Sequence, residues 1–281
     1  MSWIGIKKAI NRAGTQVMLK TGQIEQTVDK EFEYQEKRYR AMEANSLKLQ
    51  KNLRSYLESL RILTNSQINI AESLSSFYGN GPSTDNRDKD GKDGKDIKSK
   101  ELVQEYFATV KQLNDSSIKN LENPYNQTVL NPIARFNSYY SEINEVIKKR
   151  NNKLLDYDSM KNKVKKLIEH PASTDVEQYE TKLKTCNDEL KELEEKYIDV
   201  NNQLITELPK LINLRVSYFD PSFESFVKIQ LRFFNENYYI LNQLQLKLDA
   251  QTKQDYMEGK LEDRIDNVLN KMRELDITGG L

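Results

Sequence analysis

Residues 28–77 read VDKEFEYQEKRYRAMEANSLKLQKNLRSYLESLRILTNSQINIAESLSSF. Steps of four and three residues from Val28 mark a repeat that is mostly apolar, with positions Val28, Phe32, Gln35, Tyr39, Met42, Ser46, Leu49, Leu53, Tyr56, Leu60, Leu63, Gln67, Ile70, Leu74 and Phe77. A 4-3 repeat of this length is typical of coiled-coil packing. At a rise of 1.5 Å per residue, it predicts one helix of roughly 75 Å that packs along other helices.

Glycine and proline are placed as they would be in a protein of few, long helices. The chain has 281 residues, ten glycines and six prolines, and no glycine lies between residues 95 and 258. Tight turns use these residues, so few turns are expected there. Further apolar repeats predict helices over 100–169 and 175–251, interrupted or bent by the four prolines within them, Pro124, Pro132, Pro209 and Pro221.

The remaining segments connect or extend these helices. Residues 79–99 are polar and rich in glycine and aspartate, which predicts a flexible loop. A turn is expected at 170–174, and a weaker helix at about 255–276. Together these patterns predict an all-α fold, an elongated and kinked antiparallel coiled coil of three helices.

The stretch after Pro221 is apolar on more than one side of its helix. A helix of that kind must be buried on several sides. Three helices cannot bury it so fully, so we expect a dimer. The residues expected at the dimer interface are Phe223, Phe226, Phe233, Phe234, Tyr238 and Leu241.

Residues 1–22 form an amphipathic, basic segment. An apolar stripe is expected to enter a membrane surface through Trp3, Ile6, Ile10 and Val17. Lys7, Lys8, Arg12 and Lys20 carry charge, and the segment contains no acid. A mitochondrial presequence has similar features. The next residues continue directly into the helical repeat, which favours the membrane-surface interpretation.

Charge is strongly segregated although the chain has a formal net charge of zero. Residues 147–166 carry eight bases against two acids; the bases are Lys148, Lys149, Arg150, Lys153, Lys161, Lys163, Lys165 and Lys166. Each basic residue near an anionic bilayer contributes on the order of 1 kcal/mol of attraction. Nucleic acid is the rival polyanion, but the balanced charge and lack of a nucleic-acid motif disfavour it. A solvated helix surface is the structural alternative.

Little in the sequence indicates catalysis. His170 is the only histidine and lies in a predicted turn, and Cys186, the only cysteine, occupies a core position of the repeat. Phosphate-binding loops, zinc spacings and nucleophile elbows do not occur. A single cysteine fits a reducing cytosol, and the sequence has no apolar run of about 18 residues. We therefore expect a non-enzymatic, cytoplasmic protein without metal or cofactor.

Several separated motifs resemble the N-BAR family of amphiphysins, endophilins and fungal Rvs-type proteins. Residues 3–14 (WIGIKKAINRAG) are similar to the fungal start, and 149–158 (KRNNKLLDYD) resemble the family's basic patch and the motif after it. Residues 207–209 (ELP) and 215–223 (RVSYFDPSF) are similar to a further stretch of the fungal form. The resemblance covers roughly residues 1–250 and is greatest to short Rvs-type members without an SH3 domain.

The resemblance implies a crescent-shaped dimer that binds curved, anionic membranes and tubulates them. It implies a role in endocytic vesicle scission with cortical actin, at the plasma membrane. It also implies pairing with a longer BAR relative that carries an SH3 domain, as an alternative to a homodimer. The expected organisation is a membrane-inserting segment (1–22), a BAR domain (23–251) and a C-terminal helix and tail (252–281). The functional alternative is a coiled-coil adaptor or cytoskeletal tether without lipid remodelling.

Overall fold

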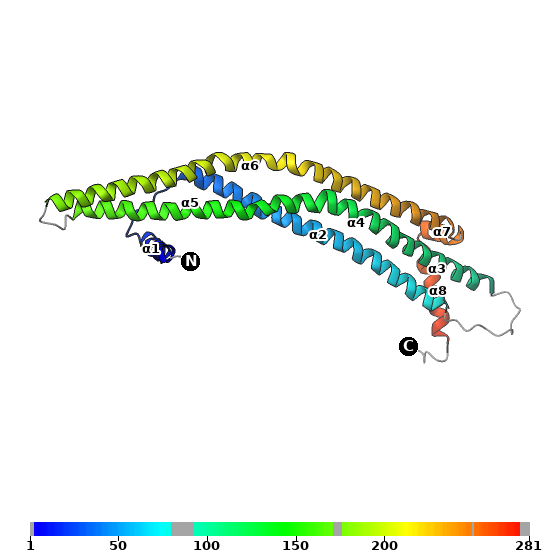
Figure 1. Cartoon of the computed structure of the whole chain (residues 1–281). Coiled ribbons are helices and arrows are strands. Elements are labelled where there is room, and N and C mark those ends of the chain that lie inside the picture. Colours follow the sequence, from blue (N-terminus) through cyan, green and yellow to red (C-terminus); the bar gives the residue numbers. More distant parts are fainter. Residues whose placement is uncertain (1–2, 80–92, 171–175, 249, 276–281) are drawn as a thin grey trace. The chain divides into compact units, whose positions relative to one another are not determined.

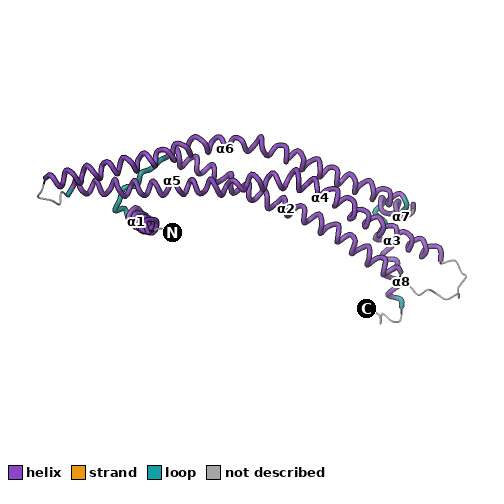
Figure 2. The backbone as a smooth tube through the Cα atoms, viewed as in Figure 1, coloured by secondary structure: helices purple, strands orange, loops and turns teal. Residues whose placement is uncertain are grey.

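The computed structural model describes residues 3–79, 93–170, 176–248 and 250–275, and within them every regular element is helical (Figures 1 and 2). The predicted all-α fold is confirmed for these residues. The α-helices are α1 (Trp3–Lys20), α2 (Lys30–Gly79), α3 (Asp93–Leu113), α4 (Lys119–Tyr125), α5 (Asn131–Glu169), α6 (Val176–Leu246), α7 (Ala250–Met257) and α8 (Leu261–Arg273). Two short π-helical segments, η1 (Asn114–Ile118) and η2 (Asn126–Leu130), flank α4.

Some predicted boundaries are wrong. Helix α3 begins at Asp93, so residues 93–99 of the predicted loop are helical, while 80–92 lie outside the described residues. The predicted C-terminal helix is two helices. They are separated by Gly259, whose positive φ of 68° closes α7 because the N–H groups of Gly259 and Lys260 bond back to α7 carbonyls. The predicted turn after His170 falls on undescribed residues.

The prolines act differently in the two long helical segments. The region around Pro124 and Pro132 departs from α-helical geometry, with a π-helical segment before each proline. Pro132 itself lies in the first turn of α5, where its missing N–H would have no partner in any case. By contrast, α6 continues through Pro209 and Pro221 as one helix of 71 residues.

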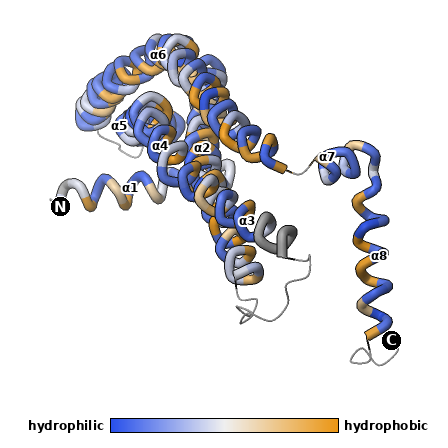
Figure 3. Tube along the Cα trace, turned by 90° about the vertical axis from the view of Figure 1, so that its right-hand side faces the viewer, coloured by the Kyte–Doolittle hydropathy of each residue, from blue (hydrophilic) through white to orange (hydrophobic). Residues whose placement is uncertain are grey.

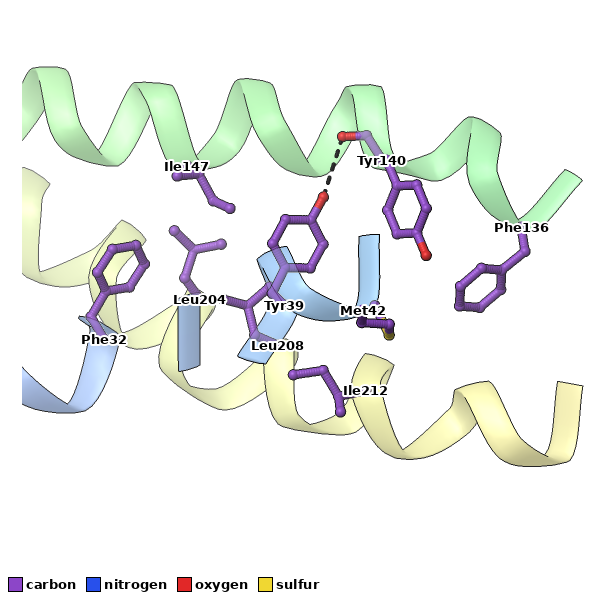
Figure 4. Close-up of a cluster of buried hydrophobic side chains, with 9 residues drawn as sticks. All are labelled: Phe32, Tyr39, Met42, Phe136, Tyr140, Ile147, Leu204, Leu208 and Ile212. Atoms are coloured by element: carbon purple, nitrogen blue, oxygen red, sulfur yellow. Dashed lines mark hydrogen bonds between the residues drawn. The ribbon is translucent and has the colours of Figure 1, made fainter. Parts of the chain in front are cut away.

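The chain divides into two compact units. Unit 1 comprises Met1–Leu53 and Thr128–Glu224, and unit 2 comprises Arg54–Gln127 and Ser225–Leu281. The core of unit 1 takes three side chains from each of α2, α5 and α6 (Figure 4); they are Phe32, Tyr39, Met42, Phe136, Tyr140, Ile147, Leu204, Leu208 and Ile212. Burying side chains of this size stabilises a fold by about 1.5–3 kcal/mol each. Within this core, the Tyr39 hydroxyl donates to the Tyr140 carbonyl.

Unit 2 has its own core between α2, α3, α4 and α6. Tyr56 and Tyr125 stack with ring centroids 6.2 Å apart, and the ring of Phe226 meets both edge-on, at 5.4 Å and 6.0 Å. Phe233, one heptad after Phe226, is 3% exposed. An ion pair between Arg61 and Glu122 then ties α2 to α4. These contacts fix which side of α6, from Ser225 onward, faces the other helices of unit 2.

The buried face of α2 leaves the predicted 4-3 repeat towards the end of the helix, although Leu53 and Leu60 are still buried as predicted. Leu57, Thr64 and Ala71 are buried there, where the repeat predicted their neighbours Tyr56, Leu63 and Ile70. The shifted phase leaves apolar side chains of α2 exposed, at Ile62, Leu63, Ile70 and Phe77. Unit 2 therefore carries an apolar α2 surface that its own helices do not cover.

Candidate membrane-binding surface

Helix α1 ends at a glycine and packs on α5 through its polar side. Gly22 has a positive φ of 71°, and the N–H groups of Gly22 and Gln23 bond to the carbonyls of Leu19 and Met18, which closes the helix. Thr15 is buried against unit 1, and Arg12 and Leu19 are half-buried. The side of α1 that contacts the protein is therefore not its apolar stripe.

The apolar stripe of α1 faces solvent. Trp3, Ile10 and Val17 are 81%, 66% and 61% exposed, and Ile6 is exposed as well. With successive residues turned by about 100°, these side chains lie on the side of α1 opposite Thr15. The insertion residues predicted from sequence thus share one uncovered face. In Figure 3 the hydropathy colours alternate along the turns of α1.

Helix α1 is attached to α5 by a two-point ion pair. Arg12 donates from Nε to Asp156 Oδ1 at 2.8 Å and from Nη2 to Asp156 Oδ2 at 2.6 Å. Paired guanidinium–carboxylate bonds of this kind are both strong and directional. Arg12, predicted as a lipid contact, therefore has a protein partner in this arrangement.

The lysines of α5 follow one another along the helix as a basic row that occupies more than one of its sides. Lys148, Lys149, Lys161, Lys163, Lys165 and Lys166 are exposed, and Lys153 is half-buried. Burial lowers the pKa of the Lys153 ammonium, and the nearby charges of Lys149 and Lys196 lower it further. Lys7 and Lys8 of α1 are also exposed. Lys196, on α6, adds its charge next to Lys153. The sequence interpretation did not include Lys196 among the lipid contacts, because residues 177–199 carry eight acids against four bases.

Arg150 is the exception, and its prediction as a lipid contact is wrong. It is 5% exposed, and its guanidinium lies 3.9 Å from the centre of the Phe32 ring. Its Nε donates to Asn201 Oδ1 at 2.8 Å and its Nη2 to the Tyr197 hydroxyl at 2.9 Å. Asp29 lies 3.9 Å away and is held by Asn201. Arg150 thus joins α2, α5 and α6 inside unit 1.

Replacing Arg150 with alanine is expected to destabilise the chain by about 3 kcal/mol, because Asp29 and Asn201 lose a largely buried partner. Lys149→Ala, at the exposed neighbouring position, should change stability by no more than about 0.5 kcal/mol. Urea unfolding followed by circular dichroism measures both values. Equal effects of the two substitutions would contradict the structural role of Arg150.

The LDYD motif, residues 155–158, follows the basic patch and is structural. Leu155 is half-buried, while Asp156 holds α1 through Arg12. Asp158 is buried and accepts a hydrogen bond of 2.6 Å from the Thr27 hydroxyl, which fixes the segment between α1 and α2. Burial raises the pKa of the Asp158 carboxyl, and the bonds from Thr27 oppose that shift. The motif therefore positions the N-terminal segment.

The predicted interface residues on α6 divide into two sets. Phe233 is buried in unit 2 and Phe226 is half-buried in its aromatic cluster, so these two belong to the chain's own core. Leu241 is half-buried. Phe223, Phe234 and Tyr238 are exposed, and the sequence interpretation missed the exposed Val227 and Leu231 between them. Positions 227, 231, 234 and 238 follow helical spacing, so they form one apolar stripe on α6.

The described part of the chain contains neither a membrane-spanning helix nor a metal cluster. No described helix is both long and apolar enough to cross a bilayer. Among the described residues, no histidine, cysteine, aspartate and glutamate side chains gather closely enough to hold a metal ion. Cys186 is buried, as its position in the repeat predicted.

Comparison with known proteins identifies the family. The sequence model of the BAR domain matches residues 6–250. This chain belongs to the BAR domain family. It is 64% identical to the RVS161-like protein RVS162 of Candida albicans, over all of both chains. It is 41% identical to the Regulator of cytoskeleton and endocytosis RVS161 of Candida albicans, over 99% of this chain and 98% of that protein.

A solved structure agrees with this family. The amphiphysin BAR domain from Drosophila superposes with a TM-score of 0.59 and 20% identity, and the match covers 82% of this chain and 96% of that one. The likeness supports the fold predicted from the sequence. The BAR match runs from α1 to the first residue of α7, so it includes the docked α1, the basic row of α5 and the exposed stripe of α6. Helix α8 lies beyond it.

Proposed function

We propose that this BAR-domain chain is a non-enzymatic scaffold that binds anionic bilayers and senses or generates their curvature. One observation carries the proposal. An acid-free amphipathic helix, α1, is docked by its polar side next to the lysine row of α5, with its apolar stripe uncovered. An apolar stripe and a basic row suit the two layers of a bilayer surface, hydrocarbon and phosphate.

The basic row supplies the electrostatic part of binding. Lys148, Lys149 and Lys153 are the central contacts, and Lys7, Lys8, Lys161, Lys163, Lys165 and Lys166 extend the surface. Each contributes on the order of 1 kcal/mol near an anionic leaflet, and the effect fades within a Debye length. Binding should therefore weaken steeply with salt. Arg150 takes no part, because its charge is enclosed in unit 1.

The stripe of α1 supplies the apolar part. Trp3, Ile6, Ile10 and Val17 are proposed to enter the boundary between headgroups and acyl chains, as interfacial helices do. Insertion into one leaflet expands that leaflet, which favours curvature. The attachment of α1 by Arg12 and Asp156 would transmit this effect to the helical bundle.

A second chain is proposed to cover the exposed apolar stripe of α6. The stripe at Val227, Leu231, Phe234 and Tyr238 lies in the same unit as the exposed residues of α2 at Ile62, Leu63, Ile70 and Phe77. Exposed apolar surface of this extent marks an interface. The partner is a second copy or a longer BAR relative with an SH3 domain, and the pair is proposed to form the crescent.

The proposed cellular setting is endocytosis. The relative named as a regulator of cytoskeleton and endocytosis supports action at the cytoplasmic side of the plasma membrane, with cortical actin. Membrane tubulation and vesicle scission are the steps that such a scaffold would serve. Contact with actin would be indirect, through other endocytic proteins.

Sedimentation with vesicles tests the function. The chain should pellet with vesicles of phosphatidylserine and phosphatidylcholine and should dissociate from them as the salt concentration rises. It should not pellet with vesicles of pure phosphatidylcholine. Electron microscopy of the anionic vesicles should show tubules, with the chain alone or mixed with its SH3-bearing relative. A chain that pellets with neither vesicle would support the adaptor alternative. Preference for duplex DNA over vesicles in competition would favour the nucleic-acid alternative.

Replacing Ile10 and Val17 together with serine should weaken vesicle binding by about tenfold to a hundredfold, because two exposed apolar side chains no longer enter the bilayer. The charge of the chain is unchanged, so the change isolates insertion. A matched control replaces Leu47 and Leu49, exposed on α2, with serine. Equal binding by both double variants would show that α1 does not insert.

A further inference from the structure

Helix α8 is an amphipathic helix outside the BAR match. No residue of α8 is buried against the described part of the chain. Leu261, Ile265, Val268 and Met272 follow one another in steps of four, three and four residues, and the last three are exposed. This spacing places the four side chains on one side of the helix and is typical of a coiled-coil seam. Helix α8 therefore presents an apolar side that suits packing against another helix.

The position of α8 is set by α7. Nη1 of Arg264 donates to Oδ2 of the buried Asp255 at 3.0 Å and also to the hydroxyl of Thr252. Held in this way, α8 brings none of its side chains into the core of unit 2. The apolar side of α8 therefore needs a surface that its own chain does not supply in this arrangement.

An anionic bilayer does not suit α8. Glu262 and Asp263 of its first turn and Asp266 of the next are exposed, whereas α1 contains no acid. The attraction of an anionic leaflet is for bases, and carboxylates are repelled by it. The apolar side of α8 thus fits a protein surface better than the membrane that α1 is proposed to enter.

The exposed stripe of α6 has the same spacing as the apolar side of α8. Val227, Leu231, Phe234 and Tyr238 also follow in steps of four, three and four residues, and all four are exposed. Each apolar position of α8 can therefore meet one position of the stripe, whether the two helices run parallel or antiparallel. None of the side chains beside the stripe repels the acids of α8; they are Gln230, Asn235, Asn237 and Lys228.

The exposed side of α2 fits α8 less well. Its positions in 4-3 spacing are Leu63, Ser66, Ile70, Ser73 and Phe77. Serine occupies every second position, so an apolar helix packed there would remove a hydroxyl from water in alternate layers, which is unfavourable. The α6 stripe has an aliphatic or aromatic side chain at each of its four positions.

We propose that α8 of one chain packs on the exposed stripe of α6 in a second copy, and that the reciprocal contact completes a two-fold dimer. In such a dimer the same two surfaces meet twice. The inference rests on the dimer of the proposed function and names the segment that covers α6. Helix α8 would thereby add a contact that lies beyond the BAR match.

Disulfide trapping tests the contact in the full chain. Cys186 is first replaced with alanine, so that only introduced thiols can pair. A chain with Leu231→Cys is mixed with a size-tagged chain that has Val268→Cys or Ile265→Cys, the α8 positions opposite Leu231 for antiparallel and parallel helices. The control is Asn270→Cys, on the side of α8 opposite its seam. A disulfide forms only where the two Cα atoms come within roughly 7 Å.

Oxidation should join the Leu231→Cys chain to one of the two seam variants and not to the Asn270→Cys chain. Linkage of two Leu231→Cys chains to each other, without linkage to α8, would show that α6 pairs with α6 and would overturn the contact. A chain with both Leu231→Cys and Val268→Cys that closes an internal disulfide and forms no linked dimer would place α8 on its own α6. That result would overturn the contact as well.

Sedimentation velocity separates this inference from the proposed dimer. Replacing Ile265 and Val268 with serine should raise the dimer Kd at least about tenfold, because four apolar side chains leave the two contacts. The matched control, Asn267→Ser and Asn270→Ser, lies outside the seam and should leave Kd unchanged; circular dichroism verifies that both variants fold. A monomeric wild type would overturn the proposed dimer itself. A wild-type dimer whose Kd is the same in both double variants would overturn only the contact of α8.

Discussion

Reversing the charge of Lys148, Lys149 and Lys153 with glutamate is expected to abolish sedimentation with phosphatidylserine vesicles. Each reversal removes an attraction of about 1 kcal/mol and adds a repulsion of similar size. Three reversals cost about 6 kcal/mol, on the order of ten-thousandfold in the partition coefficient. Arg150 is left in place, because its substitution would damage the core and confuse loss of binding with loss of folding.

A charge-matched variant distinguishes the effect of the α5 lysines on vesicle binding from the effect of the net charge of the chain. Lys37, Lys48 and Lys51 are exposed on α2 in the same unit, and replacing them with glutamate changes the charge by the same amount. This variant should keep most of its vesicle binding, with a modest loss from longer-range repulsion. An equal loss in both variants would show that total charge, rather than the α5 row, governs binding.

The basic run illustrates what a charge count can and cannot predict. Counting charges over 147–166 finds the exposed lysines but includes Arg150 among them. Helical spacing contains the missing information, since Ile147, Arg150, Leu154 and Asp158 are three or four residues apart and all are buried. Following the apolar stripe through the charged run would have placed Arg150 in the core. Its partners on α2 and α6 were beyond prediction, because they are distant in sequence.

The repeat in α2 holds over more than half of the helix. Phe32, Tyr39, Met42, Ser46, Leu53 and Leu60 are buried as predicted, and beyond Leu60 the buried face moves by one residue, to Thr64 and Ala71. An α-helix drifts about 20° per heptad against a strict 3.5-residue repeat. Five heptads therefore accumulate about 100°, the turn of one residue. A repeat fitted from one end loses its phase along a helix of 50 residues.

The aromatic segment of α6 shows a different limit. Its composition predicted burial on several sides, but composition does not assign each side chain to its own unit or to a partner. Phe226 and Phe233 pack inside unit 2, whereas Phe234 and Tyr238 remain outside. That assignment depends on Tyr56 and Tyr125, which reach Phe226 from distant parts of the chain.

Replacing Leu231 and Tyr238 with glutamate is expected to convert the proposed dimer into a monomer. These side chains are 61% and 72% exposed in the single chain, so the substitutions should leave its fold intact. In the dimer they would bury four carboxylates without partners, which is strongly unfavourable. Losing two interface anchors alone costs at least about 4 kcal/mol, on the order of a thousandfold in Kd. Sedimentation velocity at micromolar concentration measures the change.

The control uses the same residue types elsewhere. Leu214 on α6 and Tyr139 on α5 are exposed in unit 1, and replacing both with glutamate should leave the dimer intact. Mixing each variant with the SH3-bearing relative then tests the heterodimer, which should fail only when Leu231 and Tyr238 are changed. Because curvature requires a rigid particle with two membrane-contacting ends, the monomeric variant should still bind anionic vesicles weakly through α1 and α5 yet form no tubules. Tubulation by a proven monomer would separate curvature from dimerisation and leave insertion of α1 as its cause.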